Sequence, residues 1–344
     1  MRLLFCTSYP HLPEVIGGLQ TATDDLCEML VERGVECIFL CGQSPHGPRQ
    51  VQRQDDKFGY KVIRAADPVS ALPMIAASFE PTAIIVQTGY VLMPMLIAAV
   101  ETRIPTAIYL HNLELQQIGG NLMPHPSLFF ISNSDYTAKR LRALANIQSL
   151  VLPPVVRPER YIAPHIGNRV LFVNPTQVKG VDIVVRLAEA HPDIPFTLVE
   201  SWELDGAWRN YQRRRTDCLH NVEWLPPTDD MKSLYAQARL LMMPSLWEEA
   251  YGRTVIEAQL NGLPVISSDR GALPDTVGEG GMVLHAHAPI EDWSHALSLV
   301  YKDPATWGYL SAKALENARN TVLSNQIQID ELLSRLAIHP PPEL

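Results

Sequence analysis

The chain has 344 residues, of which 47% are apolar and 19% are charged, and its formal net charge is −9 at pH 7. This length suits two domains of ordinary size, and the apolar content excludes a disordered chain. The acidic balance argues against a general nucleic-acid-binding protein, because a phosphate backbone is held mainly by Lys and Arg.

Three features of the sequence predict a cytoplasmic protein without a transmembrane segment. The five cysteines are odd in number and include no Cys-x-x-Cys pair, which is typical of reduced thiols. Residues 1–11 contain no apolar stretch of signal-peptide length. The most apolar stretch, residues 83–100, contains Gln87, Gly89 and Pro94, which indicates a strand, a turn and a helix rather than a membrane span.

Short apolar runs alternate with amphipathic segments along the whole chain. The first run, RLLFCTS, is followed by a helical pattern that ends at Gly34. Further runs lie at 36–42, 83–89, 106–112, 128–134, 169–175, 195–201, 239–245 and 264–270. Continuously apolar strands separated by helices predict parallel sheets with helices on both faces.

The alternation starts again near residue 169, after a Pro-rich stretch at 152–168 that is the best linker candidate. We therefore predict two doubly wound α/β domains, residues 1–160 and 161–320. Residues 321–344 form the end of a helix and a tail, able to pack back on the first domain. This helix is expected to end near Ile338, because HPPPEL cannot continue it.

The stretch SLWEEAYGRTVIEAQLNG combines carboxylates with a glycine between a strand and a helix. Glu249 is expected in the loop, and Glu257 in the first turns of the helix that Gly252 introduces. In open α/β sheets, ligands bind at the carboxyl ends of the strands, and backbone amides at a helix start attract anions. The alternative from spacing alone is that Glu257 merely favours the helix N-terminus and the other acids are solvated.

The longer block PSLWEEAYGRTVIEAQLNGLPVISSDRGALPDTVGEGG resembles the Glu-x(7)-Glu region of retaining glycosyltransferases of family four. Under this resemblance Glu249 and Glu257 are the motif pair. It implies the GT-B fold, in which two Rossmann-like domains face each other across a cleft. The domain at 1–160 would then take the acceptor, and the domain at 161–320 the nucleotide sugar.

Four other positions lie where the family has functional groups. Gly17 and Gly18, otherwise a plain turn, would belong to the active site. His111, a lone histidine at a strand end, would lie near the donor sugar. Lys179, otherwise a solvated lysine, would neutralise the diphosphate. Asn174 stands five residues before it, where the family commonly has Arg, which leaves the second cation in doubt.

The resemblance implies two sets of site residues. The catalytic set is His111, Glu249 and Lys179. The donor-binding set is Gly17, Gly18, Asn174, Lys179, Glu249, Ala250, Tyr251, Gly252, Arg253, Thr254 and Glu257. Arg253 and Arg270 are alternatives for the missing positive charge. No cluster has metal-ligand spacing and the family normally works without a metal, so no metal or other cofactor is expected.

These features predict a retaining glycosyltransferase of the hexosyltransferase type, acting in glycan, glycolipid or glycosylated-metabolite biosynthesis. A nucleoside-diphosphate sugar is the expected co-substrate. The first half has no strongly basic amphipathic helix, so we expect a soluble acceptor or only weak membrane association. Two alternatives remain: a sugar-nucleotide-binding protein without turnover, suggested by Asn174, and a Rossmann-type NAD(P) oxidoreductase. For the latter, no Gly-x-Gly-x-x-Gly follows either leading strand. The base, the sugar, the acceptor and the oligomeric state are not predicted.

Overall fold

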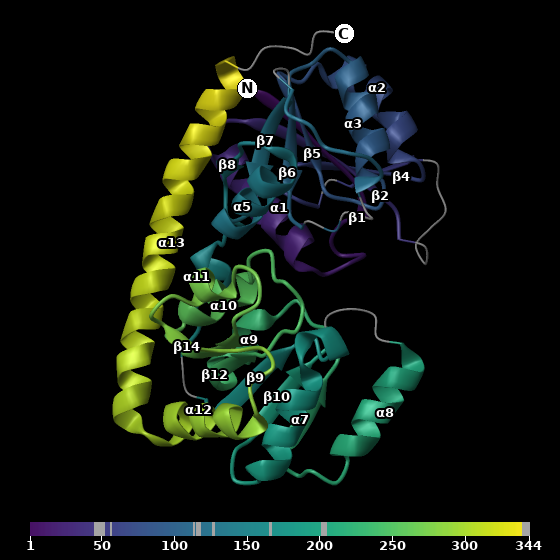
Figure 1. The fold of residues 1–344 in the computed structure, drawn as a ribbon. Coiled ribbons are helices and arrows are strands. Elements are labelled where there is room, and N and C mark those ends of the chain that lie inside the picture. The colour runs from purple at the N-terminus through teal and green to yellow at the C-terminus, as the bar shows by residue number, and fades with distance from the viewer. Residues whose placement is uncertain are drawn as a thin grey trace. The chain divides into compact units, whose positions relative to one another are not determined.

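The computed structural model describes residues 1–44, 52–55, 57–112, 114, 118–125, 128–164, 167–200 and 205–338. The chain forms two compact units (Figure 1). The first comprises Met1–Val155 and Asn325–Leu344, and the second comprises Val156–Ser324. The division thus lies slightly before the predicted boundary at residue 160, inside the Pro-rich stretch. That stretch is not an open linker, because Pro158–Tyr161 form helix α6 and Val155, Val156 and Tyr161 are buried.

The first unit is built on an eight-stranded sheet with the order β3-β4-β2-β1-β5-β6-β7-β8. Its strands are β1 (Arg2–Pro10), β2 (Glu36–Gly42), β3 (Gln52–Asp55), β4 (Lys61–Ala65), β5 (Ala83–Gln87), β6 (Thr106–Leu110), β7 (Leu128–Ser132) and β8 (Leu150–Val151). Neighbouring strands are parallel except β3, which pairs antiparallel with β4 at the edge. The sequence analysis predicted the parallel strands of the centre and missed β3, β4 and β8.

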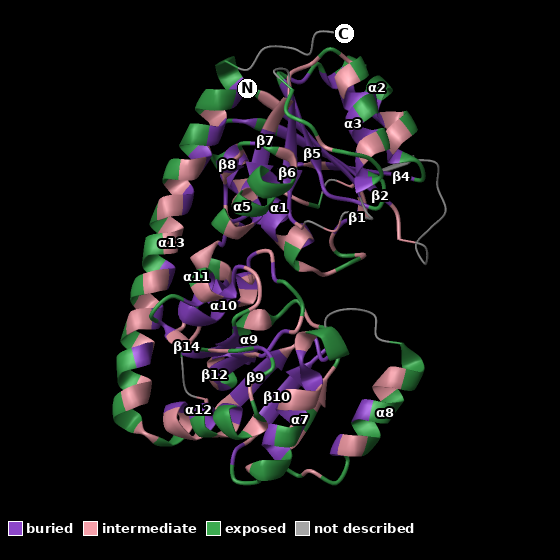
Figure 2. Ribbon diagram, in the orientation of Figure 1, coloured by how far each residue is buried: buried purple, intermediate pink, exposed green. Residues whose placement is uncertain are grey.

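Helices cover both faces of this sheet. Successive side chains of a strand point to opposite faces, so an apolar strand gives both faces apolar side chains that the helices bury. Leu3 and Phe5 of β1 pack in the core that contains α1, whereas Leu4 and Cys6 pack in the core beneath α2, α3 and α5. The helices are α1 (Gly18–Glu32), α2 (Pro68–Phe79), α3 (Leu92–Glu101) and α5 (Asp135–Ala145). Figure 2 shows the central strands of both units buried, whereas α8 and α13 carry exposed residues.

The second unit contains a six-stranded, wholly parallel sheet with the order β11-β10-β9-β12-β13-β14. Its strands are β9 (Arg169–Val173), β10 (Phe196–Val199), β11 (Val222–Leu225), β12 (Ala238–Met243), β13 (Val265–Ser268) and β14 (Gly281–Leu284). Its helices are α6 (Pro158–Tyr161), α7 (Val181–Ala190), α8 (Gly206–Thr216), α9 (Met231–Gln237), α10 (Arg253–Gln259), α11 (Leu273–Val277) and α12 (Ile290–Lys302). Helices α7 and α12 pack on one face, and α6, α9, α10 and α11 on the other.

The long C-terminal helix α13 (Pro304–Ile338) contributes to the cores of both units. Leu310 and Ala318 pack in the second unit, and Leu332 packs in the first together with two further apolar residues of the same helix, Ile329 and Leu336. Within the described part of the chain, no helix is long and apolar enough to cross a membrane.

Candidate functional site

The loop between β12 and α10 carries Glu249 and is anchored on both sides by backbone hydrogen bonds. The amides of Leu246 and Trp247 donate to Val178 O at 2.8 and 3.0 Å. The amide of Ala272 donates to Glu249 O at 2.7 Å. Because β9 and β12 are neighbours in the sheet, the segments that follow them meet at the same edge.

Two glycines make this close backbone packing sterically feasible. Gly180 has φ +83°, and a Cβ there would lie 2.1 Å from Pro244 O. Gly271 has φ +63°, and a Cβ there would lie 2.1 Å from Glu249 O. Any side chain at either position would displace the Glu249 loop, so both glycines serve the geometry of the site.

Lys179 and Glu249 are in direct contact in the second unit. Lys179 Nζ lies 2.5 Å from Glu249 Oε1, and their side chains are only 14% and 10% exposed. Lys179 ends a short 3₁₀ turn at Gln177–Lys179. An ammonium–carboxylate pair with so little solvent around it is a strong, charge-assisted hydrogen bond. The sequence analysis selected both residues without predicting their contact. Glu248, which it excluded from the motif pair, is exposed.

Glu257 lies in the second turn of α10 and is 4% exposed. Its carboxylate accepts a hydrogen bond from Arg253 Nε at 2.6 Å and another from Tyr235 Oη at 2.7 Å. Arg253 is also buried. Its guanidinium is therefore committed to Glu257, one helical turn away, and is not an open cation for a diphosphate.

The other residues of the predicted motif block form the backbone around these carboxylates. Tyr251 is buried and its carbonyl accepts a hydrogen bond from Thr276 Oγ1 at 2.7 Å. Thr254 Oγ1 faces Met243 Sδ at 3.7 Å. Ala250 precedes Tyr251 in the loop, and Gly252 is the residue before α10. Helix α10 has seven residues, and Gly252 before it has φ +92°.

Asn174 directly follows β9, at the same edge of the sheet as Lys179. Its backbone has φ +65°, and its amide N–H donates to Val199 O at 2.8 Å. The side chain is 5% exposed, and its Oδ1 has no hydrogen-bond partner among the described residues. A neutral carboxamide does not supply the positive charge of the Arg that the family commonly has here.

The remaining predicted residues, Gly17, Gly18 and His111, belong to the first unit. Gly17 is the N-cap of α1. A Cβ added at Gly18 would have no atom within 4 Å, so packing does not require glycine there. Gln20 Nε2 donates to Pro10 O at 3.1 Å and ties the start of α1 to the end of β1.

His111 follows β6 and is nearly buried. Its amide donates to Thr88 Oγ1 at 3.0 Å, its carbonyl accepts from Asn133 Nδ2 at 2.9 Å, and its ring lies 4.0 Å from that of Tyr109. Burial lowers the pKa of His111 to about 3. Its Nε2 has no hydrogen-bond partner among the described residues. The imidazole is thus neutral near pH 7 and retains hydrogen-bonding capacity.

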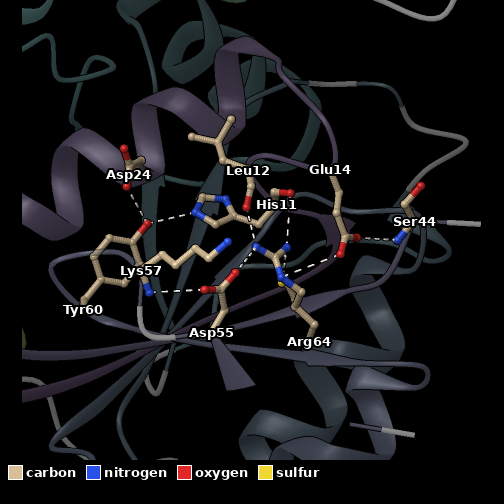
Figure 3. A network of polar contacts seen from close by, with 10 residues as sticks. His11, Leu12, Glu14, Asp24, Ser44, Asp55, Lys57, Tyr60 and Arg64 are labelled. Atoms are coloured by element: carbon tan, nitrogen blue, oxygen red, sulfur yellow. Dashed lines mark hydrogen bonds and ion pairs between the residues drawn. The ribbon is translucent and has the colours of Figure 1, made fainter. Parts of the chain in front are cut away.

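A buried polar cluster at the loop after β1 escaped the sequence analysis (Figure 3). Arg64 of β4 has a fully buried side chain. It donates to His11 O at 3.2 Å and to Leu12 O, and it pairs with Asp55 at 3.4 Å and with Glu14 at 3.8 Å. The loop that leads to Gly17 and Gly18 is therefore fixed to the sheet edge.

The ring of His11 extends this cluster toward α1. Its Nε2 lies 2.9 Å from Tyr60 Oη, and Tyr60 donates in turn to Asp24 Oδ1 at 2.9 Å (Figure 3). Because the tyrosine proton is used by Asp24, Nε2 of His11 carries the proton that it donates to Tyr60. Burial lowers the pKa of His11 to about 3, so this histidine is also neutral. Within the described ranges, no three His, Cys, Asp or Glu side chains are placed to hold a metal ion.

The two units with their parallel sheets define the class of the protein, the GT-B fold. Sucrose-phosphate synthase from Thermosynechococcus elongatus has this fold and resembles the chain with a TM-score of 0.79 and 18% identity, over 98% of this chain and 99% of that one. Anabaena HepE in complex with UDP-glucose is similar with a TM-score of 0.76 and 16% identity, over 97% and 99%. At such low identity, the likeness shows the fold alone.

The sequence comparisons then identify the family. Residues 16–160 match the model of Glycosyltransferase Family 4, and residues 166–321 match that of Glycosyl transferases group 1. The chain belongs to glycosyltransferase family 4. This result leaves the NAD(P) oxidoreductase alternative without support.

Two curated relatives illustrate how far the similarity extends. A D-inositol 3-phosphate glycosyltransferase of Corynebacterium diphtheriae is 29% identical over 157 residues, which are 42% of this chain and 36% of that protein. Spore coat protein SA of Bacillus subtilis is 30% identical over 136 residues, 35% of this chain and 36% of that protein. The match thus spans about a third of the length of these relatives.

Proposed function

We propose that the chain is a retaining glycosyltransferase of the hexosyltransferase type, which moves a sugar from a nucleoside-diphosphate sugar to an acceptor hydroxyl. The observation that supports this proposal is the contact of Lys179 with Glu249, in the loop that leads to the helix on which Glu257 is buried. A family-4 chain thus carries a cation suited to a diphosphate and two carboxylates suited to hydroxyls in neighbouring segments of its second unit.

The difficult step is the departure of the diphosphate while positive charge develops at the anomeric carbon. The anomeric C–O bond breaks, the acceptor oxygen forms the new bond on the same face, and its proton passes to the leaving phosphate oxygen. Lys179 stabilises the negative charge on the diphosphate. Glu249 accepts hydrogen bonds from sugar hydroxyls, and Glu257 accepts them from ribose, so that binding energy serves positioning.

The pair of Lys179 and Glu249 couples these two roles. Without a donor, each charge is compensated by the other across 2.5 Å. A diphosphate draws the ammonium toward itself and leaves lone pairs of the Glu249 carboxylate available for sugar hydroxyls. In the filled site the diphosphate compensates the ammonium, and hydrogen bonds from the sugar hydroxyls stabilise the Glu249 carboxylate.

The first unit supplies the residues that we place near the sugar and the acceptor. The neutral imidazole of His111 would contact the donor sugar, and the loop at Gly17 and Gly18 would approach the donor with its backbone. The acceptor remains unidentified, and weak membrane association is compatible with the proposal. We also place the protein in the cytoplasm, because Cys6, Cys27, Cys37, Cys41 and Cys218 are free thiols.

We infer further that the reaction needs no metal ion, since Lys179 provides the positive charge for the leaving group. Donor turnover should then be unchanged, within about twofold, when EDTA is added. A loss of turnover that Mg²⁺ or Mn²⁺ restores would refute this part of the proposal.

A second candidate, a sugar-nucleotide-binding protein without turnover, is favoured by one observation. Asn174 is neutral where the family commonly has Arg, and Arg253 is committed to Glu257. Binding and turnover separate the two candidates. A binding protein would retain a nucleoside diphosphate without ever releasing sugar from the donor.

The proposal is tested first by calorimetry with UDP, GDP, ADP and NAD on the wild type and on Glu257→Ala. One nucleoside diphosphate should bind, with affinity weakened at least about tenfold in the variant, and NAD should not bind. Sugar release from the matching donor is then measured for Glu249→Gln, with Glu248→Gln as the matched control in the same loop.

Glu249→Gln should reduce turnover by roughly 10²-fold or more, and Glu248→Gln by less than about twofold. Unchanged turnover in Glu249→Gln would disprove the assignment of Glu249. Binding without turnover in the wild type would select the second candidate, and binding of NAD alone would refute both.

A further inference from the structure

The carboxylate of Glu257 is surrounded by groups that fix its orientation. One oxygen receives Arg253 Nε at 2.6 Å, and the other receives Tyr235 Oη at 2.7 Å. Glu257 is 4% exposed, Arg253 is 6% exposed and Tyr235 is fully buried. Two donors on two different oxygens define the plane of a carboxylate, which a single donor would leave free to rotate.

Arg253 is itself held by helix α6. Its Nη2 donates to Tyr161 Oη at 2.7 Å, and its Cζ lies 5.4 Å from the centroid of the Tyr161 ring. Asn261 fastens α6 to α10, because its Nδ2 donates to Tyr161 O at 3.1 Å and to Glu257 O at 3.0 Å. The side chain and the backbone of Glu257 are thus both tied to α6.

These contacts leave Glu257 able to accept more hydrogen bonds. A carboxylate has about four lone-pair positions, and Arg253 and Tyr235 use one on each oxygen. One position on each oxygen therefore remains, the number that a pair of vicinal hydroxyls requires. Arg253 also compensates the negative charge of the buried carboxylate across 2.6 Å.

We propose that Arg253, Tyr235 and Tyr161 are positioning residues that orient the Glu257 carboxylate toward the two hydroxyls of the donor ribose. This inference rests on the proposed function, in which Glu257 binds ribose. It also assigns Arg253 a role different from that of a diphosphate cation. Lys179 then remains a cation that the second unit offers to the diphosphate.

The stability of α10 does not by itself explain this cluster. Val255, Ile256 and Ala258 are each at most 1% exposed and already attach the helix to the core. Buried ion pairs can often be replaced by apolar residues without loss of stability, because removing both charges from water is costly. A buried cluster with two tyrosine hydroxyls and a guanidinium around one carboxylate is explained by the need to define its direction.

The test measures how strongly each protein prefers ribose over a sugar without hydroxyls. UDP, GDP or ADP, whichever binds most tightly, is compared by calorimetry with its 2′,3′-dideoxy counterpart. The wild type should prefer the ribonucleotide by about 100-fold, the equivalent of two hydrogen bonds to a charged group. Tyr235→Phe and Tyr161→Phe should each reduce this preference to about tenfold or less, while the affinity for the dideoxynucleotide changes by less than about twofold.

Two controls separate positioning from general damage. Tyr301→Phe removes another tyrosine hydroxyl of the second unit, which donates to Asn168 O at 2.7 Å, and should leave the preference unchanged. In a Glu257→Gln background, Tyr235→Phe should cause no further loss, because its effect acts through the carboxylate. Both Phe variants preserve the ring and its packing, so they should fold.

The outcomes are distinguishable. Equal weakening of the ribonucleotide and the dideoxynucleotide in Tyr235→Phe would show a purely structural role and overturn the inference. A wild type that binds nucleoside diphosphates without preferring ribose would overturn it too, while the diphosphate site at Lys179 would stand. A wild type that binds none of the three nucleotides would refute the proposed function together with the inference.

Discussion

The environment of His111 determines its protonation. The backbone of this residue is held on both sides by Thr88 and Asn133, and among the described residues no charged group compensates an imidazolium there. Burial lowers its pKa to about 3, whereas in an unfolded chain the value is about 6.5. The folded protein therefore binds fewer protons than the unfolded chain between these two pH values.

This difference makes stability depend on pH with a defined sign. The contribution of neutral His111 is complete above about pH 6.5 and is lost progressively as the pH falls toward 3. Between pH 7 and pH 5, the loss of this contribution should lower the free energy of unfolding by about 2 kcal/mol. Measured by urea denaturation over this pH range, the free energy of unfolding of His111→Gln should fall by about 2 kcal/mol less than that of the wild type. The contribution of His11 cancels in this comparison, because both proteins contain it. Equal losses in the two proteins would mean that His111 is protonated in the folded state.

At the scale of elements, α13 contributes side chains to the cores of both units. The side chains of Ile329, Leu332 and Leu336 are at most 3% exposed in the core of the first unit, yet they lie some 170 residues after that unit's other residues. Leu323 and Ile327, on the same helix, are 65% and 70% exposed. The helix therefore stabilises the first unit through one face only.

Leu332→Ala should destabilise the first unit by about 3 kcal/mol, the typical cost of a cavity in a packed core. Leu323→Ala, the matched control, should change stability by less than about 0.5 kcal/mol. All six tryptophans lie between residues 202 and 307, so their fluorescence reports the second unit, whereas circular dichroism reports both. The variant should shift the circular dichroism transition in urea to lower concentration and leave the fluorescence transition in place. A shift of both would show that the units unfold as one.

The elements that the sequence predicted are those whose composition matches their environment. Central strands such as β1 and β5 are buried on both faces and read as apolar runs, whereas β3 (QRQD) is wholly polar and β11 (VEWL) is short and has no fully buried residue. The burial of Arg64 was unpredictable, because the carbonyls it binds belong to His11 and Leu12, more than fifty residues away. The i, i+4 spacing of Arg253 and Glu257 is compatible with an ion pair, but the sequence analysis took Arg253 as a cation for the diphosphate and did not predict the pair. No local pattern indicates Tyr235 or Tyr161.

At the scale of the whole molecule, the residues to which we assign roles are divided between the two units. Lys179, Glu249 and Glu257 belong to the second unit, and Gly17, Gly18 and His111 to the first. The roles that we assign to these residues follow the same division between the units. Under the proposed function, the second unit would hold the nucleoside diphosphate, and the first unit would contact the sugar and the acceptor. The two parts of a donor should therefore affect the two units separately.

Hydrogen exchange with and without ligand tests this division of roles. A nucleoside diphosphate alone should protect amides around 174–181 and 245–259 and stabilise the second unit, by about 2.7 kcal/mol at a hundredfold excess over Kd. The complete nucleotide sugar should in addition slow exchange around 14–20 and 110–112, where Gly17, Gly18 and His111 lie. Protection that never extends to the first unit would remove those three residues from the donor site and confine donor recognition to the second. Protection of the first unit by the diphosphate alone would instead mean that it recognises the nucleotide rather than the sugar.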